Sequence, residues 1–113
     1  DILGLPLQLP SKAMEVRRTS HPEPLIQQAR EYIAQLETGA GVLVLTDACG
    51  STPSNVARIA AEGKMCRVLA GVNLPMLLAI YTQPIGNLED MAQRALFAGR
   101  QGVIFADREW QEI

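Results

Sequence analysis

The sequence predicts an α/β fold in which a largely parallel sheet carries helices on both faces. Short, mainly apolar runs at residues 42–45, 66–70 and 103–106 are typical of strands, and the continuous run at 42–45 is typical of a strand that is buried on both faces. Segments whose apolar residues recur at helical spacing separate these runs. Glycine, proline and polar residues mark the turns between them. This alternation of strands and helices is the pattern of a doubly wound sheet.

Bulk composition limits the class of protein. A chain of 113 residues that is 48% hydrophobic and 19% charged has the size and composition of one globular domain. A net charge of -2, no basic run and 4% aromatic residues make nucleic acid a poor candidate partner. No apolar run approaches the roughly 20 residues of a membrane span, and the first residues lack the basic region of a signal peptide. We expect a cytoplasmic domain.

The first half of the chain predicts two strands and a helix. Residues 1–13, with two prolines and a glycine, suggest a helix end followed by a loop. A short strand is predicted at 14–18. Apolar residues at helical spacing predict a helix over about 23–37. The run at 42–45 has no alternation and predicts a strand buried on both faces.

The second half continues the alternation. The predicted elements are a helix at about 53–61, a strand at 66–70, a helix at about 74–81, a helix that begins at Asn87 and ends at Gly99 and Gly102, and a strand at 103–106. Pro53 suits the first position of its helix, and Thr52 is the predicted N-cap. Asn87 is the predicted cap of the last helix.

Two turns, at 46–54 and 71–75, follow neighbouring predicted strands. In a doubly wound sheet both turns face the same edge, where such sheets bind ligands. The first turn carries Asp47, several hydroxyls and the start of a helix, whose amides favour an anion. The pair therefore predicts a site for a small anion, with phosphate the best candidate.

Each side chain in these turns also has a purely structural interpretation. Asp47 can orient a histidine or lysine, act as a base or bind a metal, but it can equally bond its own backbone. Ser51, Thr52 and Ser54 can bond phosphate oxygens, although one of them is needed as the helix cap. Asn73 can cap its own helix, which is the preferred interpretation. Neither a dinucleotide fingerprint nor a Walker A motif is present, so no cofactor is expected.

Other reactive side chains are weaker candidates. His21, the sole histidine, could carry a phosphoryl group, but its Thr-Ser-His-Pro context favours an exposed loop residue. Cys49 lies in the first turn without a nearby His or Lys in sequence, so a small residue that fills space is preferred over a reactive thiol. Cys66 is placed at the start of a buried strand. The spacing of the two cysteines fits no zinc or redox motif, and no metal is expected.

The two turns resemble a known family. Gly-Val-Leu-Val-Leu-Thr-Asp-Ala-Cys-Gly-Ser-Thr-Pro-Ser-Asn-Val-Ala (41–57) and Ala-Gly-Val-Asn-Leu-Pro-Met-Leu (70–77) are similar to the IIA domain of the mannose-type sugar phosphotransferase system (PTS). The resemblance covers about residues 14–106. It implies a flavodoxin-like fold, a homodimer and a cytoplasmic phosphocarrier. It also implies a histidine that takes phosphate from the phosphocarrier protein HPr and passes it to a IIB partner.

The resemblance also assigns roles to individual residues. Asp47 matches the aspartate that hydrogen-bonds the acceptor histidine and fixes its tautomer. Ser51, Thr52 and Ser54 match the segment that receives the phosphoryl group, and Asn73 matches the rim of the site. The family's histidine ends a first strand in a Val-Thr-His-Gly-like motif, which this sequence lacks, and His21 does not match it.

The acceptor histidine is therefore expected upstream of Asp1. We expect that residues 1–113 form a single IIA domain that lacks its first strand and most of its first helix, about 20 residues in all. An alternative from another class is a PTS-derived regulatory module that binds a partner protein without being coupled to sugar transport. A weaker alternative is a small hydrolase or transferase that uses Asp47 and Cys49.

Overall fold

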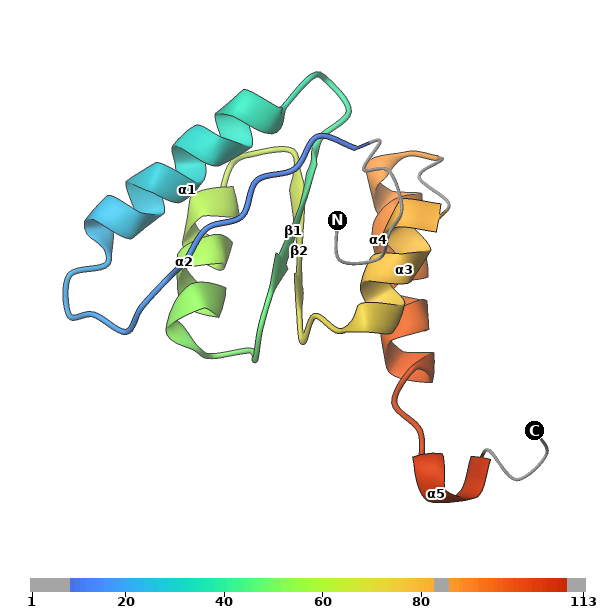
Figure 1. Cartoon of the computed structure of the whole chain (residues 1–113). Helices are drawn as coiled ribbons and strands as arrows, with labels where there is room; N and C mark the ends of the chain where they lie inside the picture. Colours follow the sequence, from blue (N-terminus) through green and yellow to red (C-terminus); the bar gives the residue numbers. More distant parts are fainter. Residues whose placement is uncertain (1–8, 83–85, 110–113) are drawn as a thin grey trace.

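The computed structural model describes residues 9–82 and 86–109. Its elements are α1 (Glu23–Leu36), β1 (Val42–Thr46), α2 (Thr52–Ala61), β2 (Cys66–Ala70), α3 (Leu74–Thr82), α4 (Leu88–Gln101) and the short α5 (Ala106–Glu109) (Figure 1). The predicted α/β class is confirmed. The helix end expected before residue 9 lies outside the described residues.

The described sheet consists of two parallel strands. β1 pairs with β2 in a register that runs from Val42 opposite Cys66 to Thr46 opposite Ala70. Each strand has five residues, and both lie where the mainly apolar runs predicted them. The helix α2 joins them as the crossover that a parallel pair requires.

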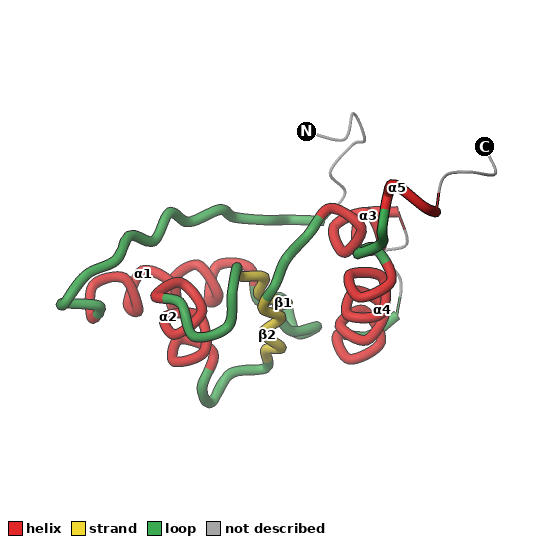
Figure 2. The backbone as a smooth tube through the Cα atoms, turned by 90° about the horizontal axis from the view of Figure 1, so that it is seen from below, coloured by secondary structure: helices red, strands yellow, loops and turns green. Residues whose placement is uncertain are grey.

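Helices cover both faces of the pair, with α1 and α2 on one side and α3 and α4 on the other (Figure 2). Side chains alternate between the faces of a strand, so each face has its own apolar core. One core packs β1 against α1 and α2 and contains the buried residues Ile33, Val42 and Ala60. The other packs β2 against α3 and α4 and contains Leu69, Met76, Ile80 and Ala95.

Two predicted strands are wrong. The structure has no strand at 14–18, where the chain runs extended across the molecule on the side of β1 (Figure 2). Residues 103–105 have no regular structure, and α5 begins at Ala106. A strand exists only where a second strand accepts its backbone hydrogen bonds. Among the described residues, neither segment has such a partner.

Two predicted helix ends also shift. The N-cap of α2 is Ser51 rather than Thr52, because the Ser51 hydroxyl accepts the Ser54 N–H at 3.2 Å and Thr52 begins the helix. The helix α4 continues through Gly99 and stops at Gly102, whose N–H bonds the Ala98 carbonyl at 2.9 Å. In the ranges 9–82 and 86–109, no helix is both long and apolar enough to cross a membrane.

Candidate functional site

Backbone hydrogen bonds join the two turns that the sequence singled out. The Gly71 N–H donates to the Asp47 carbonyl at 2.7 Å, and the Val72 N–H donates to the Thr46 carbonyl at 3.0 Å. These bonds continue the pairing of β1 and β2 past the ends of the strands. The expected meeting of the turns at one edge of the sheet is therefore confirmed.

The side chain of Asp47 is exposed at this edge and is held from one side. The Ser51 hydroxyl donates to Asp47 Oδ1 at 2.6 Å while it accepts the Ser54 amide as the N-cap of α2. This single hydroxyl fixes the carboxylate relative to the first turn of the helix. The other lone pairs of the carboxylate stay open to a further donor, because an ionised carboxylate accepts several hydrogen bonds.

Several backbone amides between β1 and α2 are uncommitted. The N–H groups of Ala48, Cys49, Gly50 and Thr52 form no hydrogen bond with any described residue. The Gly50 backbone has φ +91°, a conformation that L side chains rarely adopt. Uncommitted amides beside the start of a ten-residue helix favour a bound anion.

The three candidate hydroxyls occupy different environments. Ser51 and Thr52 are half-buried beside the turn, whereas Ser54 is buried at 8% exposure. The Ser54 amide is already bonded to Ser51, so its contribution to the turn is structural. Thr52 combines a half-buried side chain with an uncommitted amide. The turn therefore offers Thr52 and the neighbouring amides as its best donors to an anion.

Asn73 uses both of its side-chain polar atoms within the protein. Its Oδ1 accepts the Met76 N–H at 3.0 Å, which confirms that Asn73 caps its own helix. Its Nδ2 donates to the Gly99 carbonyl of α4 at 2.9 Å, a long-range contact that sequence reasoning missed. A phosphate contact by Asn73 stays a prediction, and it would require one of these two bonds to open.

The remaining reactive residues lie in ordinary surroundings. His21 is exposed in the loop before α1, as predicted. Cys49 is exposed, so the interpretation as a residue that fills space is wrong. Cys66 begins β2 as predicted, and burial raises the pKa of its thiol. Among the described residues, no His, Cys, Asp or Glu side chains form a group of three that could hold a metal.

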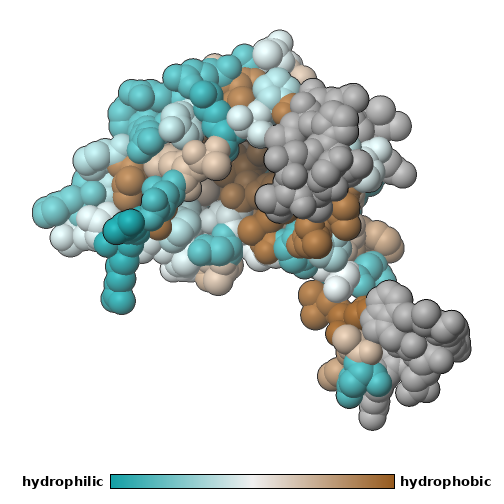
Figure 3. All heavy atoms as spheres, in the orientation of Figure 1, coloured by the Kyte–Doolittle hydropathy of each residue, from teal (hydrophilic) through white to brown (hydrophobic). Residues whose placement is uncertain are grey.

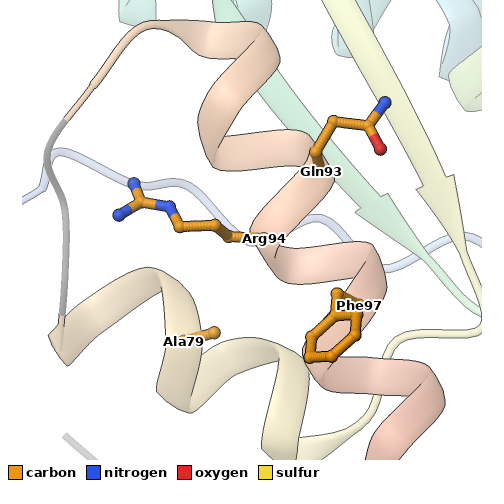
Figure 4. Close-up of a pocket in the computed structure, with 4 residues that line it drawn as sticks. All are labelled: Ala79, Gln93, Arg94 and Phe97. Atoms are coloured by element: carbon orange, nitrogen blue, oxygen red, sulfur yellow. The ribbon is translucent and has the colours of Figure 1, made fainter.

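A surface pocket of about 350 Å³ lies apart from these turns. Ala79 of α3 and Gln93, Arg94 and Phe97 of α4 line it (Figure 4). None of these residues belongs to the turns that follow β1 and β2. The pocket is therefore a separate feature from the candidate anion site.

Known proteins similar to this chain support the family resemblance that the two turns indicated. A family model described as "PTS system fructose IIA component" matches residues 7–96. The chain is 36% identical over 84 residues to the PTS system mannose-specific EIIAB component of Escherichia coli strain K12, and equally to that of Shigella flexneri. These matches cover 72% of the chain but 26% of each relative, so the chain spans about a quarter of their length.

A solved structure supports the fold. The phosphotransferase system component EIIA from Streptococcus agalactiae superposes with a TM-score of 0.60 at 24% identity. The match covers 73% of this chain and 68% of that one. Fold and turns together define an α/β domain whose sheet edge suits a small anion. Within that class, the chain belongs to the mannose-type family of PTS IIA components.

Proposed function

We propose that the domain is a phosphocarrier of a sugar PTS, which accepts a phosphoryl group on a histidine from HPr and passes it to a IIB partner. One observation carries the proposal. In a chain of this family, Asp47 stands at the joined turns with one oxygen held by Ser51, next to uncommitted amides at the start of α2. A carboxylate beside free amides suits the transfer of a phosphoryl group to a histidine, because the carboxylate can bind the imidazole and the amides can bind the phosphoryl oxygens.

In the proposed reaction, the Asp47 carboxylate acts on the histidine, and the amides and hydroxyls of the turn act on the phosphoryl group. A neutral imidazole nitrogen attacks the phosphorus of the donor's phosphohistidine, the donor's P–N bond breaks, and the donor's imidazole leaves. Asp47 accepts the N–H of the other ring nitrogen and stabilises the imidazolium that forms. The amides of residues 48–50 and of Thr52, with the Ser51 and Thr52 hydroxyls, hold the phosphoryl oxygens. Ser54 supports them from its buried position.

The acceptor histidine is proposed to end a strand that lies upstream of Asp1 and pairs with the open side of β1. In a parallel ladder, alternate residues bond to one neighbour, and the bonds of Val42 and Thr46 go to the β2 side. The backbone groups of Leu43 and Leu45 therefore face the other side. There, no described strand meets them. Such a strand would extend the pair into the doubly wound, flavodoxin-like sheet.

We further propose that the protein is a homodimer and that it acts in the cytoplasm. A run of exposed apolar side chains follows α4: Val103 is 77%, Ile104 49% and Phe105 72% exposed. Brown atoms mark this region at the lower right of Figure 3. Exposed apolar area of this kind is characteristic of protein contact surfaces. A second copy of the chain is the proposed occupant.

The test is phosphorylation of the longer protein that includes the upstream strand. With HPr, its kinase and a phosphate donor present, the protein should acquire one acid-labile phosphohistidine. Asp47→Asn should lower the transfer rate by at least about 100-fold, since the asparagine amide favours the wrong tautomer. Its melting temperature should stay within a few degrees, because Asp47 is exposed.

The matched control is Glu31→Gln, which also removes one exposed carboxylate but lies on α1. It should transfer phosphate at the rate of the parent protein. Absence of any acid-labile phosphate on the parent would rule out the phosphocarrier function and favour a regulatory binding module. A transfer rate that Asp47→Asn leaves unchanged would remove Asp47 from the mechanism.

A further inference from the structure

We infer that Asn73 is a positioning residue, which fixes the second turn and through it Asp47 by closing the ends of two helices at once. Asn73 is half-buried and directly precedes α3. Its carboxamide oxygen accepts the Met76 N–H at 3.0 Å, and its nitrogen donates to the Gly99 carbonyl at 2.9 Å. Asparagine can do both because its side chain carries an acceptor and a donor.

Both partners are backbone groups at the ends of helices. The Met76 N–H is one of the first four amides of α3, and the Gly99 C=O is one of the last four carbonyls of α4. Such groups have no partner within their own helix. One side chain therefore satisfies a backbone group at the start of α3 and one at the end of α4, although Asn73 and Gly99 are 26 residues apart along the chain.

Position 99 of α4 lies directly at the contact with α3. Gly99 is buried, and a Cβ added there would lie 2.9 Å from Met76 Cε and 3.4 Å from Asn73 Oδ1. A side chain at this position would displace the flexible end of Met76 and would reach ordinary van der Waals contact with the asparagine that bonds the Gly99 carbonyl. The bond between Asn73 and Gly99 is thus part of the α3–α4 contact and not an accidental surface contact.

The turn that Asn73 anchors holds the backbone of the carboxylate residue. Gly71 and Val72 immediately precede Asn73, and they donate to the carbonyls of Asp47 and Thr46 at 2.7 and 3.0 Å. The end of α4 is thereby connected to Asp47 through Asn73 and this turn. The connection itself is a property of the fold. Its consequence for phosphoryl transfer rests on the proposed function.

The test compares Asn73→Ser with Asn87→Ser by amide hydrogen exchange. Asn87 is a matched control, because it caps α4 by accepting the Asp90 N–H at 2.8 Å and makes no second side-chain bond to a described residue. Serine keeps an N-cap acceptor at either position. Asn73→Ser alone should speed exchange of the Gly71 and Val72 amides, by about fivefold to tenfold for one lost hydrogen bond.

A second measurement needs no variant. In the parent protein, the side-chain NH₂ protons of Asn73 should exchange more slowly than those of Asn87. Equal side-chain exchange, or equal effects of the two serine variants on Gly71 and Val72, would overturn the inference. In the phosphorylated system, Asn73→Ser should lower kcat and leave KM for the donor unchanged. Failure of the parent protein to accept phosphate would count against the proposed function, while the exchange data would still decide this inference.

Discussion

At the scale of single residues, Ser51 holds the candidate site together. Its hydroxyl group makes two hydrogen bonds. It donates to Asp47, and its oxygen accepts the Ser54 N–H and so caps α2. The sequence predicted that one hydroxyl of the turn must cap the helix, but it placed the cap at Thr52. Local pattern could not decide between adjacent residues, because either hydroxyl suits an N-cap and the exact path of the turn selects one.

Replacing Ser51 should therefore cost stability as well as carboxylate orientation. Ser51→Ala should lower the free energy of unfolding by about 1 kcal/mol, the usual value of a lost N-cap, as measured by urea denaturation. Ser51→Asn keeps an acceptor at the cap and should retain most of that stability. Equal losses in the two variants would show that the cap bond contributes little.

Glu37 gives the fold a dependence on pH. Its carboxylate accepts the Gly41 N–H at 3.0 Å and the Gly39 N–H, and these bonds hold the pKa of Glu37 below its ordinary value of 4.5. A lowered folded-state pKa stabilises the fold above the unfolded value, and that contribution is lost as pH falls through the folded value. Glu37→Gln should thus be less stable than the parent near pH 7.

The difference should shrink as the pH falls well below 4.5, because the parent then carries a protonated, uncharged Glu37. Melting temperatures of both proteins across this range measure it. The control is Glu31→Gln. The Glu31 carboxylate is exposed on α1 and forms no hydrogen bond with a described residue, so the melting temperature of this variant should follow that of the parent. If the difference in melting temperature between Glu37→Gln and the parent stayed constant with pH, ionisation of Glu37 would not be its cause.

At the scale of secondary-structure elements, the α3–α4 contact positions the second turn. The helices meet closely where Gly99 and Gly102 face α3. A Cβ at Gly102 would lie 2.2 Å from Pro75 Cγ, and the proline ring has little freedom to move away. This contact explains why the end of α4 matters for a turn that lies far from it in sequence.

Gly102→Ala should accordingly destabilise the protein by about 1–3 kcal/mol, the usual range for overpacking a well-packed contact. Urea denaturation measures the change. Arg100→Ala removes an exposed side chain from the same end of α4 and should be nearly neutral. A Gly102→Ala variant as stable as Arg100→Ala would show that α4 moves freely relative to Pro75.

At the scale of the whole molecule, the apolar residues after α4 form a continuous run that the described chain leaves exposed to solvent. Phe105 is 72% exposed and Phe97 of α4 is 66% exposed. Water contact with apolar side chains of this size is unfavourable, so burial against a second copy would be stabilising. The proposed homodimer should depend on them.

Phe105→Glu should therefore shift the protein from dimer to monomer in sedimentation velocity while its circular dichroism is unchanged. Gln35→Glu adds the same charge at an exposed position of α1 and should leave the dimer intact. A Phe105→Glu protein that sediments as the parent does would place the contact between copies elsewhere. A parent that is monomeric at all concentrations would contradict the dimer itself.

By itself, the sequence determined the α/β class, the positions of both described strands and the four long helices, and the two turns that carry Asp47 and Asn73. Periodicity, capping residues and glycine act over a few residues and can be recognised locally. Only the tertiary structure decided that 14–18 and 103–105 form no strand, because a strand needs a pairing partner. It also decided that Asn73 bonds Gly99, since that contact depends on how two distant helices pack.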